Sequence, residues 1–385
     1  MDIRADIKSN KFGTYDFTKE KSTYLDGVSP GQYNIWNKWD KLETVMLGDH
    51  YRSAFFDDIK NTRIRGALQR IADETQEDLE HYEKVLKDFG CDVVRPYLDH
   101  NKGIMDYIDN QGRGQYWSSG VPRSPLQTRD MQFVGGNNLF FTNYENGVAQ
   151  RFFDYNFSDS VDIKKSMEMD GIFAPSYTMV GRDIYIDQYD CKLRDDQIAA
   201  LKQNIPNVRI NTLNHGGHSD GCFHTIKPGA ILSILDIQTY QDTFPDWDIC
   251  YLPNQSWGQV QGFTSMKEKV NGKWWIPGEE ENDELTHFVE TWLQDWVGFV
   301  EETVFDVNVL VLDEHHVCVN NMNPTVIEFL KKHKMEPVHV PWRHRYFLDG
   351  GLHCITLDIK RNGTQQDYFP ERGDTGVIDY GTPYE

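Results

Sequence analysis

A strand-turn-strand unit recurs along this 385-residue chain, and it constrains the fold more than any other feature. In each copy two short apolar runs flank a tight polar or glycine-containing turn, which is the pattern of a β-hairpin. The turns near Gly136, Arg182 and Pro228 follow one another at intervals of 46 residues. A fourth turn lies near Glu314, after a gap of 86 residues that suggests an insertion. The chain is therefore predicted to consist of copies of one β-containing module.

Helical periodicity fills the gaps between these hairpins wherever it can be detected. The predicted elements are helices at 64–89, 194–203 and 324–333, the last beginning with the capping pair Asn323-Pro324, and apolar strands at 44–48 and 354–359 that open and close the series. Strand pairs that alternate with helices imply an α/β architecture. A ring of modules would protect the sheet edges, whereas too few units are visible for the alternative, a linear solenoid.

The segment from residue 237 to about 300 interrupts the repeat and is rich in Trp, Asp and Glu. Within it, residues 282–296 have a helical pattern, and the rest is typical of a structured loop that covers an active site. An inert surface insertion is the other interpretation. We expect residues 1–385 to form one domain that carries this insertion, with an irregular end after residue 360, where the chain is polar with scattered Gly and Pro.

Composition excludes several classes of partner. The net charge of −21 disfavours nucleic acid and anionic lipid, because both require a basic face. The apolar runs are too short to span a membrane, and the first residues resemble neither a secretory signal nor a transit peptide, so the cytoplasm is the expected location. Six scattered cysteines without a paired motif predict reduced thiols.

A glycine pair and a histidine directly precede Cys354, at the start of an apolar strand in the stretch Gly350–Thr356. Glycines permit backbone conformations closed to other residues and let a ligand approach the main chain. Cys354 is therefore a candidate nucleophile. A buried core cysteine at the start of a strand is the alternative, and it is the more frequent situation for a cysteine without such neighbours.

His218 and Asp220, two residues apart, follow a second glycine pair. In an extended chain this spacing aims both side chains at one face. The imidazole can accept a proton from a nearby thiol and later protonate a leaving amine, and an ionised Asp220 suits a planar cation with several N–H donors. Two alternatives stay open: together with Cys222 and His224 these residues have the types of zinc ligands, or the histidines are simply satisfied within the fold.

Asp130 lies six residues before the turn glycine of the first hairpin, and Ser176 lies six residues before Arg182 in the second. The equal spacing predicts that both side chains point toward the centre of a ring. Asp130 would then be a second carboxylate for a guanidinium group. A structural ion pair with the neighbouring Arg129 is the alternative.

Taken together, these stretches resemble the amidinotransferases of the arginine:glycine and inosamine-phosphate type. They belong to the superfamily that modifies guanidino groups, which includes arginine deiminases and dimethylargininases. The resemblance runs from NKWDKLETVMLG, which begins at residue 37, to DGGLHCITLDIKRNG, which ends at residue 363. The patterns GG-x-H-C-x-T and H-x-D in this order are specific. The resemblance implies a five-bladed α/β propeller of pseudo-fivefold repeated ββαβ modules that needs no cofactor and no metal.

The resemblance also implies roles for single residues. Cys354 corresponds to the nucleophile and His218 to the general acid/base, while Asp130 and Asp220 clamp the guanidinium group of the donor. The implied reaction moves an amidino group from arginine to an amine through a covalent intermediate on Cys354 and releases ornithine. The expected partners are therefore small molecules, and a homodimer is left open as the assembly state.

Two positions depart from the family pattern. An aspartate usually orients the catalytic histidine, but the matching stretch FAPSYTMVGRD has Ser176 there, whose hydroxyl stabilises an imidazolium less than a carboxylate does. The arginine expected to hold the carboxylate of glycine falls on Ile237, and the neighbouring Glu301 and Glu302 are acidic. A diamine or another cationic amine is therefore predicted as the acceptor rather than glycine.

Two further functions share most of these features. In a deiminase-type hydrolase, water takes the place of the acceptor amine, and the covalent intermediate is the same. In a non-catalytic binding relative, the absence of the histidine-orienting aspartate would reflect a lost activity. The products formed from arginine distinguish these possibilities.

Overall fold

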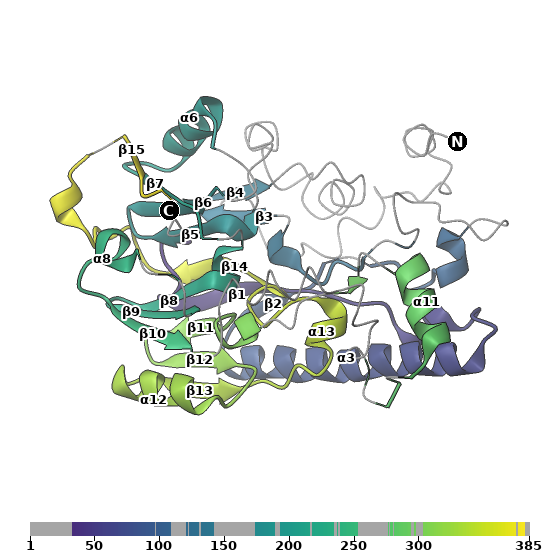
Figure 1. Ribbon diagram of the computed structural model, residues 1–385. Helices are drawn as coiled ribbons and strands as arrows, with labels where there is room; N and C mark the ends of the chain where they lie inside the picture. The colour runs from purple at the N-terminus through teal and green to yellow at the C-terminus, as the bar shows by residue number, and fades with distance from the viewer. Residues whose placement is uncertain are drawn as a thin grey trace.

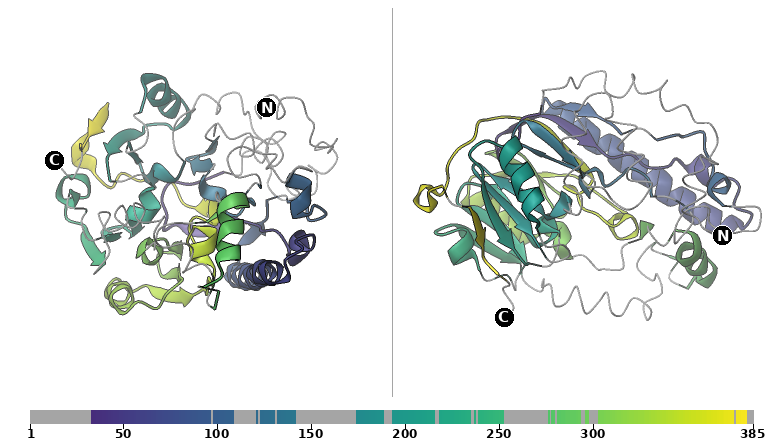
Figure 2. Two further views of the ribbon diagram at one scale, coloured as in Figure 1. Left: turned by 45° about the vertical axis from the view of Figure 1, so that its right-hand side comes forward. Right: turned by 90° about the horizontal axis from the view of Figure 1, so that it is seen from above.

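The protein has an α/β architecture in which strands form five small sheets with helices around them (Figures 1 and 2). We describe it from a computed structural model. The structure describes residues 33–96, 98–108, 121, 123–130, 132–141, 174–188, 193–215, 218–234, 237, 239–252, 276, 278–279, 281–293, 296–297, 303–374 and 376–381. Within this part of the chain the five sheets are not joined to one another by strand pairing. The predicted α/β class is confirmed, and the five-bladed ring stays a prediction.

All four predicted hairpins are present as antiparallel pairs. Their strands are β3 (Gln132–Gly135) with β4 (Asn138–Phe141), β5 (Tyr177–Val180) with β6 (Asp183–Asp187), β8 (Phe223–Lys227) with β9 (Ala230–Ile234), and β11 (Leu310–Asp313) with β12 (His316–Val319). In the first two turns, Gly136 and Gly181 have positive φ angles of 59° and 64°. Such angles strain residues that carry a Cβ atom, so glycine is the residue that fits these turns.

Three of the described hairpins continue into a helix and a third strand. The helix and strand are α6 (Asp195–Asn204) and β7 (Arg209–Leu213), α8 (Tyr240–Thr243) and β10 (Asp248–Leu252), and α12 (Pro324–Lys332) and β13 (Glu336–His339). Each third strand pairs in parallel with the second strand of its hairpin. A parallel pair needs a crossover connection, which the helix provides. These units are therefore ββαβ modules, and their helices lie outside the strands (Figure 1).

One sheet combines strands from distant parts of the chain. Strand β1 (Lys41–Leu47) pairs in parallel with β2 (Asp92–Val94) and antiparallel with β14 (Thr356–Asn362). The strands predicted to open and close the series are thus neighbours. Cys354 lies two residues before β14, so the pairing of β14 with β1 fixes the position of Cys354 relative to β1.

The helix α3 (Thr62–Asp88) connects β1 to β2 and is the longest in the described chain. The side chain of Asn61 caps it by accepting hydrogen bonds from the backbone N–H groups of Arg63 and Ile64, at 3.0 and 3.2 Å. One apolar stripe of the helix is buried, as its spacing predicts. The stripe consists of Ile64, Ala67, Leu68, Ile71, Ala72, Leu79, Tyr82 and Leu86. These side chains join a hydrophobic core shared with β1 and β11.

The helix predicted at 282–296 is present as α11 (Asp283–Trp292), and Asn282 caps it. Most of the predicted insertion, including residues 253–275, lies outside the described residues. The tail after residue 360 differs from the prediction in one respect: it contains β15 (Val377–Asp379), which pairs in parallel with β7. Backbone pairing with an existing sheet orders a polar segment that composition alone marks as irregular.

The remaining short elements connect these modules. They are the 3-10 turns η1 (Ser53–Phe56), η2 (Ile104–Tyr107) and η8 (Pro370–Arg372), and the helix α13 (Arg345–Leu348). No helix in the described ranges is both apolar enough and long enough to pass through a bilayer.

Candidate active site

Five side chains occupy equivalent places in the five sheets. Each stands one to three residues before a strand, in a short turn or loop: Asp130 in η3 (Thr128–Asp130) before β3, Ser176 in η5 (Ala174–Ser176) before β5, Asp220 in α7 (Ser219–Cys222) before β8, Asn308 after η7 (Thr303–Asp306) before β11, and Cys354 before β14. Hydrogen bonds join three of the five, which are Asp220, Asn308 and Cys354. The corresponding ends of different sheets therefore meet around one centre.

Asn308 holds the loop that carries Cys354. Its Oδ1 atom accepts hydrogen bonds from the backbone N–H groups of His353 and Cys354, at 2.8 and 3.1 Å. Its Nδ2 atom donates to Cys354 Sγ at 3.0 Å and to the carbonyl oxygen of Asp220 at 3.3 Å. A donor aimed at sulfur favours the thiolate, because hydrogen bonds to a charged acceptor are the stronger ones. The amide thus fixes the sulfur and can stabilise its ionised form.

The close approach of Asn308 explains one glycine of the pair before Cys354. A Cβ atom at Gly351 would lie 2.5 Å from Asn308 Oδ1, well inside van der Waals contact. At Gly350 a Cβ atom would meet the Cβ atom of Cys354 at 3.3 Å, which is tight but less severe. Gly351 therefore makes room for the amide that positions the thiol.

Substitution of Gly351 by alanine is expected to destabilise the protein and to displace Asn308 from Cys354. Overpacking of this kind costs about 1–3 kcal/mol. The measurements are the free energy of unfolding in denaturant and the alkylation rate of Cys354. Gly66→Ala is the matched control: a Cβ atom there meets nothing within 4 Å in α3, so it should stabilise by about 0.5–1 kcal/mol. Equal unfolding free energies for the two variants would contradict this account.

Asp220 is buried and interacts with His353 and Cys354, two residues of the loop before β14, which is called the thiol loop below. Its Oδ2 atom lies 3.5 Å from Cys354 Sγ and accepts a hydrogen bond from His353 Nδ1 at 2.7 Å. Its Oδ1 atom has no hydrogen-bond partner in the described part of the chain. Burial holds the pKa of His353 well below its usual value, so this imidazole is neutral at pH 7. Asp220 thus offers one free carboxylate oxygen beside the sulfur.

Asp130 is partly buried, and its Oδ1 atom is shielded from solvent without a hydrogen-bond partner among the described residues. Burial raises the pKa of Asp130 to about 6, and the electrostatic interaction with His218 opposes this rise. Asp220 adds to it, since like charges disfavour ionisation. The electrostatic coupling indicates that the three side chains lie near one another. At pH 7 Asp130 is mostly ionised and can receive a cation.

The neighbouring Arg129 does not form the structural pair with Asp130 that was the alternative. Its Nη2 atom donates to Asp358 Oδ1 at 2.6 Å, and its Nε atom donates to the carbonyl oxygen of His353 at 3.0 Å. Arg129 therefore supports the loop before β14 and leaves the carboxylate of Asp130 available.

A hydrogen bond connects the backbone of Ser176 to Ser219, the residue that follows His218. The hydroxyl of Ser219 donates to the carbonyl oxygen of Ser176 at 2.8 Å. Ser176 is buried, and His218 adopts an extended backbone at the start of α7, with φ −61° and ψ 106°. The bond links η5 to α7 and restrains the backbone from which the imidazole of His218 projects.

The zinc alternative finds no support in the described residues, among which no group of three or more His, Cys, Asp or Glu side chains is arranged to hold a metal ion. The sulfur of Cys222 lies 3.5 Å from the carbonyl oxygen of His215. The ring of His224 contacts that of His353 edge to face, with centroids 4.6 Å apart. Because Asp220 lies in the helix α7 and His218 directly precedes it, the expected alternation of an extended chain does not apply to these residues.

The predicted site residues thus lie in one region, and the structure adds one that the sequence analysis missed. Asn308 lies six residues before the turn at Glu314, the same spacing as Asp130 and Ser176 in their hairpins. That spacing was the available signal. Ile237, the position expected to hold a carboxylate-binding arginine, is fully buried, and the acidic residues 301 and 302 lie outside the described residues.

The chain is similar in sequence to several known amidinotransferases. The chain is 40% identical over 390 residues to glycine amidinotransferase of Gallus gallus, covering 87% of this chain and 84% of that one. It is 23% identical over 276 residues to the L-arginine:L-lysine amidinotransferase of Pseudomonas savastanoi, covering 70% and 60%. Matches to glycine amidinotransferases of Danio rerio and Xenopus laevis span 15% and 28% of those chains. No protein-family model matches the chain.

Among solved structures, SxtG, an amidinotransferase from Microseira wollei, superposes with a TM-score of 0.57 at 18% identity, covering 88% of this chain and 100% of that one. At this identity the likeness concerns the fold alone. The sequence match to the Gallus gallus protein extends over most of both chains. This chain therefore belongs to the amidinotransferase family.

Proposed function

We propose that this protein transfers the amidino group of L-arginine to an amine, with Cys354 as the nucleophile and His218 as the general acid and base. The observation that carries the proposal is the position of Cys354 Sγ, 3.0 Å from Asn308 Nδ2 and 3.5 Å from Asp220 Oδ2. A sulfur held between a donor and a carboxylate is oriented for attack on a cation that binds the same carboxylate.

The first half-reaction uses both carboxylates. Asp130 and Asp220 each have an oxygen without a hydrogen-bond partner in the described part of the chain, and such oxygens suit the planar guanidinium group with its several donors. The thiolate of Cys354 attacks the guanidinium carbon and forms a C–S bond. The C–N bond to the ornithine portion then breaks, and His218 supplies the proton that this nitrogen needs. Ornithine leaves, and an amidino group remains on sulfur.

The second half-reaction reverses these steps with a different amine. His218 takes a proton from the acceptor, whose nitrogen attacks the amidino carbon. The C–S bond breaks, and the electron pair returns to the sulfur of Cys354. The products are a guanidino compound and the regenerated thiolate, so the scheme is ping-pong.

The acceptor is proposed to be a cationic amine rather than glycine. Ile237 is fully buried and apolar, so it cannot bind the carboxylate of glycine. The name of the Pseudomonas savastanoi relative pairs arginine with lysine, an amine of the proposed class. The cytoplasm is the proposed place of the reaction, and small molecules are the proposed partners.

The five sheets are proposed to be the blades of one ring. The equivalent positions of Asp130, Ser176, Asp220, Asn308 and Cys354 support it, because a ring brings the same edge of each module to one axis. A ring also explains why β14 completes the sheet of β1.

Product analysis tests the proposal directly. Purified protein incubated with arginine and a panel of amines, including lysine, diamines and glycine, should form ornithine only when an amine is present. The measurement is quantitative chromatography of ornithine, citrulline and the guanidino product. Citrulline without an amine requirement would instead indicate the hydrolase. Failure to form either product, with no mass adduct on Cys354, would indicate the non-catalytic relative.

A further inference from the structure

Lys38 is a buried lysine beside the site without a visible role. Its side chain belongs to the turn that precedes β1 and is 7% exposed. Its Nζ atom is shielded from solvent and has no hydrogen-bond partner among the described residues. A buried ammonium without a partner is costly, so such a residue requires a specific explanation.

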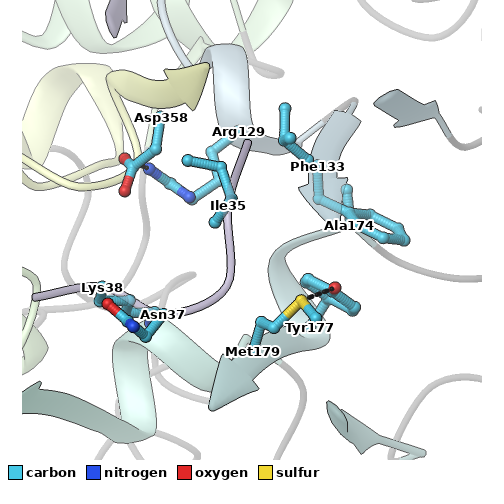
Figure 3. A pocket seen from close by; sticks show the side chains of 10 residues that line it. Ile35, Asn37, Lys38, Arg129, Phe133, Ala174, Tyr177, Met179 and Asp358 are labelled. Atoms are coloured by element: carbon cyan, nitrogen blue, oxygen red, sulfur yellow. Dashed lines mark hydrogen bonds and ion pairs between the residues drawn. The ribbon is translucent and has the colours of Figure 1, made fainter. Parts of the chain in front are cut away.

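The titratable groups coupled to Lys38 come from several elements of the fold. They are Arg129 of η3, Asp220 of α7, His224 of β8, His353 in the loop before β14, and Asp358 and Arg361 of β14. Lys38 also lines a pocket with Arg129 and Asp358, and Figure 3 shows these side chains on one side of it, opposite Tyr177 and Met179. Arg129 connects this pocket to the thiol loop through its hydrogen bond to the carbonyl oxygen of His353.

The fixed charges of this cluster cancel. Arg129 and Arg361 supply two positive charges; Arg361 lies 2.7 Å from Asp358 Oδ2. Asp358 and Asp220 supply two negative charges. Burial holds the pKa of both imidazoles well below the usual value, so they are neutral at pH 7. A thiolate on Cys354 would add one negative charge beside Asp220, and an ammonium on Lys38 would add one positive charge to these groups.

We propose that the ammonium of Lys38 is the buried counter-charge of the Cys354 thiolate. In this role Lys38 is a positioning residue: it acts through Asp220, which contacts Cys354 Sγ, and it does not touch the substrate. The inference rests on the proposed function, because it assumes that the thiolate of Cys354 is the reactive species.

The charges determine the direction in which Lys38 shifts the ionisation of Cys354. Burial lowers the pKa of Lys38 to about 7, and the carboxylate of Asp220 opposes that decrease. A thiolate nearby adds a second negative charge and favours the protonated amine further. Conversely, the protonated amine favours the thiolate. Removal of the amine should therefore raise the pH at which Cys354 ionises.

The experiment compares wild-type protein with Lys38→Met, an uncharged side chain of similar length, and with Lys38→Arg. The rate of Cys354 alkylation by iodoacetamide is measured as a function of pH by intact mass. For Lys38→Met the midpoint should move up by about one pH unit, which makes alkylation at pH 7 roughly tenfold slower. Lys38→Arg should keep the wild-type midpoint, because a guanidinium group stays charged.

Lys41→Met is the matched control, since Lys41 is exposed at the start of β1. It should reproduce the wild-type profile. A Lys38→Met profile that coincides with wild type, at an unchanged melting temperature, would overturn the inference.

A second measurement covers the case in which Lys38→Met does not fold. The side-chain NMR resonance of Lys38 is titrated in wild-type protein before and after complete alkylation of Cys354, which replaces a titrating sulfur by a neutral thioether. The Lys38 titration should move to lower pH after alkylation, and an unchanged titration would overturn the proposal. Neither experiment uses arginine, so a failure of the proposed transfer reaction and a failure of this inference give different results.

Discussion

Replacement of Cys354 by serine should abolish amidino transfer. Loss of a covalent nucleophile typically lowers kcat by about 10⁴-fold or more, because the remaining groups can only bind and polarise the substrate. The serine hydroxyl is nearly isosteric and can still accept the hydrogen bond of Asn308, so the fold should be preserved. The measurements are kcat for ornithine formation with a suitable amine and the intact mass of the protein after incubation with arginine alone. Wild-type protein should gain the mass of one amidino group.

Cys250→Ser is the matched control for this substitution. Cys250 is 6% exposed and Cys354 is 7% exposed, so the two substitutions have similar effects on burial. Cys250 lies in β10, and its sulfur faces the carbonyl oxygen of Thr325 rather than the site. The control should retain kcat and the mass adduct. Transfer by Cys354→Ser at more than a few percent of the wild-type rate would exclude sulfur as the nucleophile.

Substitution of Asp220 by asparagine is the second change with a large expected effect. Asparagine keeps the size of the side chain and can still accept the hydrogen bond from His353 Nδ1. It loses the charge that pairs with the guanidinium group. Breaking a buried charge-assisted contact costs about 2–5 kcal/mol, which corresponds to a decrease in kcat/KM for arginine of about 30-fold to 5,000-fold. Steady-state kinetics with arginine as the varied substrate measures this decrease.

Asp78→Asn tests whether the loss comes only from removing a buried carboxylate. Asp78 is 6% exposed and pairs with Arg343, at 2.8 Å, on the helix α3. This control should lower the melting temperature without changing kcat/KM for arginine. If Asp220→Asn alters kcat/KM by less than about threefold, Asp220 does not bind the donor.

The repeat in the sequence predicted the local architecture correctly because hairpins and amphipathic helices are local structures. An apolar run, a glycine that accepts positive φ and a second apolar run contain nearly all the information for a hairpin such as β5–β6. The helix α3 follows in the same way from its apolar spacing and from the cap at Asn61. The strand β15 was not predicted, because its pairing with β7 depends on a distant sheet edge.

Site residues could be predicted from the sequence where a reactive side chain has unusual neighbours along the chain. Cys354 beside a glycine pair and His218 near Asp220 belong to this class. Asn308 was missed because an amide in the apolar stretch before β11 has no chemistry of its own, and its function consists of contacts with a loop some 45 residues away along the chain. The proposed role of Lys38 likewise depends on charged groups that only the fold brings near it.

The sequence by itself determined the modules, their order and the residue types that stand before each first strand, since all of these depend on neighbours along the chain. Only the tertiary structure decided which atoms meet. Asn308 and Asp220 contact the sulfur of Cys354, Arg129 pairs with Asp358 rather than Asp130, and β14 lies beside β1. The reason is physical: hydrogen bonds and charge pairs act over a few ångströms in space, and distance along the chain does not determine distance in the fold.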